Sequence, residues 1–216
     1  MSAKGFTLVE LAIVLVIIGI IITMAIRGLG LIENSRGKKV AADVTVFVDA
    51  QNKFIERTGR YAGDSDDDGI IDFQTLNSAI SDNTSGNSGD ADFAFDELKN
   101  LGFLPSGTPN SQLSSTQRGG YMYFAGTTIT DSAGNSVPMN MVVLRNVECA
   151  AAFALEISVD SDTPASDNGA STGKIRRLSG NAFAGASWTA SDGDCVSDGK
   201  VTGSNTTNVA YIFSGI

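Results

Sequence analysis

Residues 4–26 read KGFTLVELAIVLVIIGIIITMAI, and this stretch decides the architecture of the chain. Residues 11–26 contain no charged side chain. A helix over residues 6–26 would rise about 31 Å, which is enough to cross a hydrocarbon core. Lys4 precedes the apolar run, which predicts that the leading residues stay cytoplasmic and that the chain after the run lies outside. We therefore expect a transmembrane helix over residues 6–27, followed by an extracytoplasmic part.

One acidic residue, Glu10, interrupts this apolar run four residues after Phe6. A carboxylate close to hydrocarbon costs a few kcal/mol unless it has a partner. One interpretation is that the Glu10 side chain extends to the membrane interface and stays in water. The other is that it has a function, because ionisable residues inside membrane segments mark functional sites by default.

The lysine-glycine pair at residues 4–5, Phe6, the Thr-Leu-Val-Glu run at residues 7–10 and the apolar helix form an ordered string. This string resembles the signature of type IV prepilins. The resemblance implies that prepilin peptidase cuts after Gly5 and that Phe6 becomes the N-methylated terminus. It also implies that Glu10 neutralises the Phe6 ammonium of a neighbouring subunit inside a filament. Because neither charge is tolerable alone in an apolar core, neighbouring subunits would assemble only with the axial offset that brings the two charges together.

The second half of the helix, residues 28–57, is predicted to be amphipathic and to carry the head. Gly28 and Gly30 occupy the region where pilins often have a helix breaker, so we expect a weak point there, with a gentle bend as the alternative. Residues 58–59, Thr-Gly, end the helix. The apolar residues at helical spacing are Val40, Val44, Phe47, Val48, Ala50, Phe54 and Ile55.

The resemblance implies an α+β, type IV pilin-like fold with three parts. These are a leader over residues 1–5, a long helix over residues 6–57 and a globular head over residues 58–216 with a small antiparallel sheet. Within the head we expect helices at residues 93–101, capped by Asp92, and 146–157, and strands at residues 121–124, 139–144, 174–178 and 209–213.

The composition of the head excludes several classes of function. Residues 58–216 carry nineteen Asp and Glu against eight Lys and Arg, so the head lacks the basic surface that a nucleic-acid partner needs. The whole chain contains no histidine. This removes the commonest general base, the nucleophile systems that depend on histidine and most catalytic zinc sites. We expect no enzymatic activity.

Two cysteines, Cys149 and Cys195, are far apart in sequence. In an oxidising extracytoplasmic compartment we expect them to form a disulfide. Two buried free thiols are the alternative.

An acidic run follows the long helix and predicts a calcium-type loop. Asp64, Asp66, Asp68 and Asp72 occupy positions one, three, five and nine of such a loop, and Ile70 would supply the backbone carbonyl of position seven. The bidentate glutamate of a complete EF-hand is missing, because Thr75 takes its place. The alternative is a solvated acidic turn with no bound Ca²⁺.

These features favour a structural subunit of a type IV pilus that polymerises with copies of itself. Its other partners would be prepilin peptidase, the pilus assembly machinery and the inner membrane, where it stays until it joins an extracellular filament. A pseudopilin of a type II secretion system would share the leader and the assembly physics. A minor pilin at the filament tip and a membrane-anchored binding protein are further alternatives.

Overall fold

The computed structural model describes residues 8–76, 80, 82, 88–116, 120–130, 136–161, 173–178, 195–197, 200–201 and 205–214. Within these ranges the side chains of residues 25–34, 36, 129–130, 197 and 200–201 are not described. Gly5 and Phe6, for which the sequence predicts roles in processing, lie outside the described residues.

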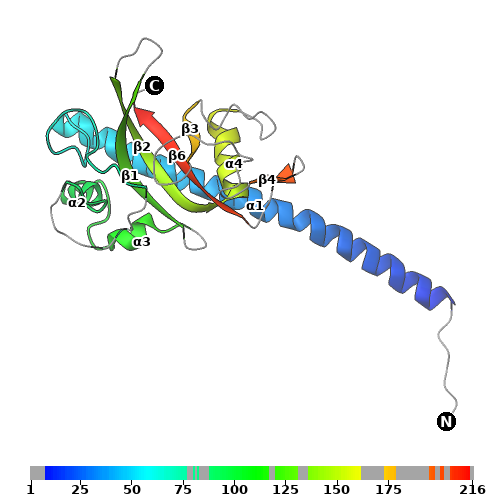
Figure 1. Ribbon diagram of the computed structural model, residues 1–216. Coiled ribbons are helices and arrows are strands. Elements are labelled where there is room, and N and C mark those ends of the chain that lie inside the picture. Colours follow the sequence, from blue (N-terminus) through cyan, green and yellow to red (C-terminus); the bar gives the residue numbers. More distant parts are fainter. Residues whose placement is uncertain are drawn as a thin grey trace.

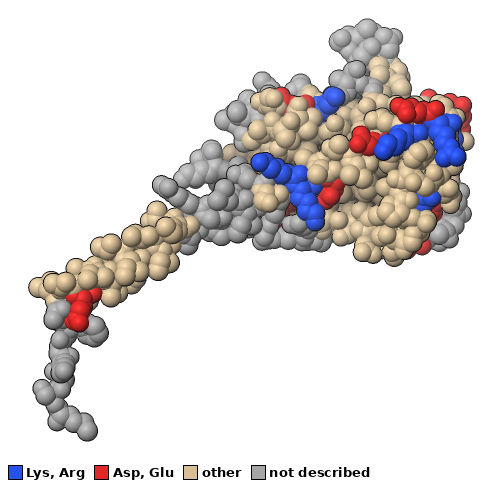
Figure 2. All heavy atoms as spheres, turned by 180° about the vertical axis from the view of Figure 1, so that it is seen from behind, with Lys and Arg blue, Asp and Glu red and all other residues tan. Residues whose placement is uncertain are grey.

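A single long helix, α1 (Leu8–Thr58), organises the structure. Its N-terminal part projects from the head, and its C-terminal part runs along the head (Figure 1). Figure 2 shows the projecting part as an almost uncharged surface, whereas the head carries both acidic and basic groups. The helix ends where the sequence predicts, because Gly59 adopts a φ of +88° and donates its N–H to the carbonyl of Ile55 at 2.8 Å. It continues through Gly28 and Gly30, whose role as a weak point stays a prediction.

The C-terminal part of α1 contributes one face to the hydrophobic core. The predicted apolar stripe is confirmed. Its buried members are Val40, Val44, Phe47, Ala50 and Phe54, and Val48 and Ile55 are half-buried. The Phe47 ring lies 5.4 Å from that of Phe95 and 5.5 Å from that of Phe124, centroid to centroid. These contacts join α1, the following helix and the sheet in one core.

The head contains a four-stranded antiparallel sheet in the order β1-β2-β6-β3. Its strands are β1 (Tyr121–Thr130), β2 (Ser136–Glu148), β3 (Ile175–Leu178) and β6 (Thr206–Ser214). The last strand of the chain therefore lies between two others and completes the sheet. Two short strands, β4 (Val196–Ser197) and β5 (Lys200–Val201), pair separately. Together with α1, this arrangement confirms the predicted α+β class.

The described residues form three further helices: α2 (Phe93–Asn100), α3 (Asn110–Ser114) and α4 (Cys149–Val159). The helix predicted from residue 146 begins at residue 149, because residues 146–148 still belong to β2. The predicted cap of α2 is wrong: no hydrogen bond from the Asp92 side chain caps this helix. At Asp92 the φ and ψ angles are −73° and −25°, which are helical, whereas a capping residue needs an extended backbone.

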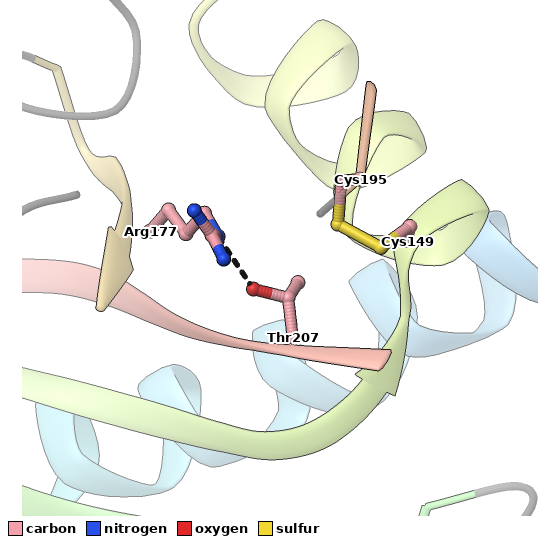
Figure 3. The surroundings of a disulfide bond; sticks show 4 residues. All are labelled: Cys149, Arg177, Cys195 and Thr207. Carbon is pink, nitrogen blue, oxygen red and sulfur yellow. Dashed lines mark hydrogen bonds between the residues drawn. A yellow bond between two sulfur atoms is a disulfide. The ribbon is translucent and has the colours of Figure 1, made fainter. Parts of the chain in front are cut away.

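The predicted disulfide joins Cys149, the first residue of α4, to Cys195, just before β4. Their Cα atoms are 5.3 Å apart, and both residues are fully buried. Figure 3 shows the bond at the start of α4, and in the same region the Nε of Arg177 donates to Thr207 Oγ1 at 2.8 Å. The bond therefore fixes the segment before the C-terminal strands to the start of α4.

The contact between α1 and α4 depends on the absence of a side chain at Gly37. A Cβ atom there would lie 2.1 Å from the Cβ atom of Ala154. We expect Gly37→Ala to destabilise the head by about 1–3 kcal/mol, because the two helices must move apart. Chemical denaturation of the head measures this loss.

A compensating substitution provides the control for this contact. Ala154→Gly removes the opposing methyl group and costs about 1 kcal/mol in helix propensity. We expect the double variant Gly37→Ala/Ala154→Gly to be more stable than Gly37→Ala alone. If Gly37→Ala is as stable as the parent, the close packing of α1 on α4 is wrong.

Candidate functional site

The acidic loop begins directly after α1, at the end of the head farthest from the N-terminus (Figure 1). Carboxylate oxygens of Asp64, Asp66 and Asp72 lie within 4.8 Å of one another. Asp64 is buried, Asp72 is half-buried and Asp66 is exposed. The structure thus brings together three of the five residues that the sequence nominates as cation ligands.

Hydrogen bonds within the loop shape this group. The Asp64 carboxylate accepts the backbone N–H of Asp68 at 3.3 Å and that of Gly69 at 3.0 Å. One oxygen of Asp72 accepts the backbone N–H of Ser65 at 3.1 Å and its hydroxyl at 2.6 Å. The turn is completed by Gly69, whose φ is +87°. These hydrogen bonds therefore hold the Asp64 and Asp72 carboxylates in place within the loop.

Asp68 and Ile70 are placed differently from the other predicted ligands. The Asp68 carboxylate accepts the backbone N–H of Ile70 at 2.8 Å, which is the pattern of an aspartate turn. Asp68 does not belong to the group of three carboxylates found among the described residues. Ile70 contributes its N–H to this turn.

The electrostatics of the loop fit a hard cation. Burial raises the pKa of the Asp64 carboxyl, the nearby Asp68 charge adds a smaller effect in the same direction, and the backbone hydrogen bonds act in the opposite direction. Burial and the charge of Asp68 thus both disfavour the ionised form of Asp64. Calcium prefers carboxylate and carbonyl oxygens, which are the donors that this loop provides.

Asn140 on β2 attaches the loop to the sheet, and sequence reasoning missed it. Its side-chain amide donates to the carbonyl of Gly69 at 2.8 Å and to the Ser214 hydroxyl at 3.0 Å, and its oxygen accepts the N–H of Ile71 at 2.8 Å. Asn140 is fully buried. No local pattern could have indicated this role, because a strand asparagine about seventy residues away makes the contacts.

Arg60 and Glu97 fix the start of the loop. The Arg60 guanidinium forms a bidentate ion pair with Glu97 and donates to the carbonyl of Asp64 at 2.6 Å. Glu97 also accepts the N–H of Gly63 at 2.8 Å. Gln51 of α1 exchanges two hydrogen bonds with the backbone of Ala62, at 2.9 and 3.0 Å. The loop is thus attached to α1 and α2 as well as to the sheet.

The projecting segment is the second candidate site. Every residue from 8 to 24 is exposed, and the large apolar residues among them are 46% to 86% exposed. Monomeric soluble proteins rarely expose an apolar surface of this extent, which marks an interaction site. Glu10 lies near the start of α1, on this exposed segment.

The sequence that contains this segment matches a known protein family. The family described as the prokaryotic N-terminal methylation motif matches residues 1–26. Residues 1–26 carry a class III signal peptide. This signal peptide is the one found in type IV pilins and pseudopilins, and it supports a pilin-like or pseudopilin precursor. No curated protein and no solved structure matches the chain.

The signal peptide indicates insertion in a membrane, removal of a leader by prepilin peptidase and assembly into pilus-like polymers. Within the described residues, none of the helices combines the length and the hydropathy of a membrane span. The transmembrane segment expected over residues 6–27 stays a prediction. Of the residues with predicted roles in the signal peptide, Glu10 is described, whereas Gly5 and Phe6 are not.

Proposed function

We propose that this protein is a structural subunit of a type IV pilus, without enzymatic activity of its own. The observation that supports this proposal most strongly is a folded head attached to a helix whose residues 8–24 are all exposed and are apolar except for Glu10 and Thr23. Such a surface needs a covering in water. Lipid of the inner membrane would cover it before assembly, and the same helices of other copies would cover it in an extracellular filament.

Processing and assembly depend on three residues in this proposal. Prepilin peptidase cuts after Gly5, and the new terminus at Phe6 is N-methylated. In the filament, the Glu10 carboxylate pairs with the Phe6 ammonium of a neighbouring copy. The methylation motif over residues 1–26 supports these assignments, which are the roles that the resemblance to type IV prepilins implies.

A pseudopilin of a type II secretion system is the second candidate. The acidic loop favours it, because calcium loops are common in that group. The length of the head and the loop closed by Cys149 and Cys195 favour the pilus instead. A membrane-anchored binding protein has less support, because the signal peptide is typical of subunits that polymerise.

Isolation of surface fibres distinguishes these functions. Fibres sheared from intact cells are expected to contain this protein as their most abundant component. Deletion of its gene should remove the fibres while other envelope structures remain. Normal fibres without this protein, together with a loss of protein secretion in the deletion strain, would contradict the pilus assignment and support the pseudopilin.

We further propose that the acidic loop binds one structural Ca²⁺ through Asp64, Asp66 and Asp72. The ion would stabilise the folded head by about 2.7 kcal/mol at a free concentration one hundred times its dissociation constant. We expect a chelator to lower the melting temperature of the purified protein and added Ca²⁺ to restore it. Asp66→Ala should abolish this difference, because it removes one of the three carboxylates of the group. Asp66 is the exposed member of that group.

Asp67→Asn is the matched control for the calcium site. Asp67 is exposed in the same loop, lies outside the carboxylate group and has a φ of +60°, which asparagine tolerates well. This variant should keep the full response to Ca²⁺. An unchanged melting temperature of the parent after chelation would rule out the calcium site.

A further inference from the structure

A groove of about 380 Å³ lies beside α1, on the side of α3. Buried apolar side chains, including Phe47 and Leu104, form part of its wall. Val46 also lines the groove but is 56% exposed. Lys39 and Asp43 precede Val46 at helical spacing, so the three residues share one face of α1. We call this surface the α1 groove.

A second exposed apolar residue, Ile157, lies on α4 and is 51% exposed. Asp160 follows three residues later and therefore lies on the same side of the helix. The Asp160 carboxylate accepts the backbone N–H of Lys174 at 3.1 Å and that of Ile175 at 2.7 Å. These bonds keep the exposed Lys174 next to the end of α4. We call Ile157, Asp160 and Lys174 the α4 patch.

The two surfaces complement each other and face different directions. In the described part of the chain, Val46 and Ile157 are the exposed large hydrophobic residues outside the projecting segment. Each is accompanied by one acidic and one basic residue. The α4 and α3 helices lie on opposite sides of α1 (Figure 1), so one copy cannot bring its own patch to its own groove.

We propose that the α4 patch of one copy docks into the α1 groove of the next copy. Ile157 enters the groove beside Val46, while Asp160 and Lys174 face Lys39 and Asp43. A second copy is the occupant because it supplies both the apolar residue and the matching pair of charges. This inference rests on the proposed filament and names a contact between heads within it.

The geometry of this contact explains why it produces a polymer. The contact is heterologous, because it joins two different surfaces of the same molecule. Each added copy therefore presents a new groove or a new patch, and the series extends as an open helix unless the rotation closes a ring. The contact between heads would fix the rotation from one copy to the next. The apolar helices would supply most of the surface that is buried on assembly.

Cysteine crosslinking in assembled filaments tests the contact. Filaments are prepared from full-length copies that carry Val46→Cys together with Ile157→Cys and are treated with a mild oxidant. We expect a ladder of dimers, trimers and longer oligomers on a non-reducing gel. A mixture of Val46→Cys copies and Ile157→Cys copies should give dimers only, since each copy then offers one engineered thiol.

The control pair is Asn52→Cys with Ile157→Cys. Asn52 is also an exposed residue of α1 but lies on a different face from Val46. This pair should give no ladder. Filaments of the Val46→Cys/Ile157→Cys protein, or mixed filaments of the single variants, that give no crosslinks would overturn the docking proposal while leaving the pilus assignment intact. Absence of this protein from any filament would instead contradict the pilus assignment.

A charged substitution gives an independent result. Ile157→Asp places a carboxylate against the apolar wall of the neighbour's α1 groove, and we expect it to lower the filament yield roughly tenfold, whereas Ile157→Leu keeps the yield. The melting temperature of the head is measured in parallel, and the loss of filaments is expected in a head that remains folded. Unchanged filament yield with Ile157→Asp would also overturn the proposal.

Discussion

Replacement of Glu10 by leucine is expected to abolish filaments on the cell surface. Leucine suits an apolar helix, so the variant should remain in the membrane and lose its leader normally. In the proposed filament, however, the N-terminal ammonium of each neighbour would enter an apolar core without a counter-charge. Removal of one partner from a buried ion pair costs about 3–5 kcal/mol, and this cost recurs at every copy. Sheared fibres, quantified per cell, measure the effect.

Two further variants identify the cause of this loss. Glu10→Gln keeps the size and removes the charge, and it should also prevent assembly. Val14→Leu changes the same exposed apolar segment without touching a charge and should polymerise normally. If Glu10→Leu and Glu10→Gln subunits form fibres as readily as the parent, the pairing of Glu10 with the neighbour's amine is wrong.

Removal of the disulfide is expected to cause the largest loss of stability in the head. Cys149 and Cys195 are 46 residues apart, and a loop of this length corresponds to about 4 kcal/mol on the chain-entropy model. Because both residues are fully buried, the hydroxyls of a Cys149→Ser/Cys195→Ser variant would add a further cost. For a domain of this size we expect the melting temperature to fall by roughly 10 °C.

The loss of stability is expected in particular strands, which makes the disulfide prediction specific. The bond holds residue 195 at the start of α4, and the backbone N–H of Cys149 donates to the carbonyl of Asn205 just before β6. Hydrogen exchange should therefore increase first in β6 and β3. Cys149→Ala/Cys195→Ala, which buries no hydroxyl, separates the loss of the bond from the cost of burying serine. Equal melting temperatures for the parent and for both double variants would contradict this role.

The elements that could be predicted from the sequence are those encoded by local patterns. The stripe from Val40 to Ile55 has the spacing of a half-buried helix, and the structure buries it as expected. The strands at residues 121–124 and 139–144 were correctly placed but too short. They continue beyond their apolar centres because β1 and β2 pair along their length, from Tyr121 with Arg145 to Thr130 with Ser136. Pairing with a neighbouring strand can therefore extend a strand beyond the segment that its own composition predicts.

Contacts that are distant in sequence could not be predicted in this way. The position of β6 between β2 and β3 depends on the whole sheet and leaves no mark within residues 206–214. The same holds for Asn140 and Glu97, which fix the acidic loop from elements far along the chain. The spacing of the aspartates correctly indicated that Asp64, Asp66 and Asp72 come together, but it did not reveal that Asp68 turns towards the Ile70 backbone.

Mass spectrometry of the mature N-terminus, using protein purified from its own cells, tests the central claim most directly. The account predicts that residues 1–5 are absent, that the chain begins at Phe6 and that this residue carries one additional methyl group on its amine. Detection of the intact sequence from Met1, or cleavage beyond the apolar segment after residue 26, would contradict the claim that this chain matures as a pilin-like subunit.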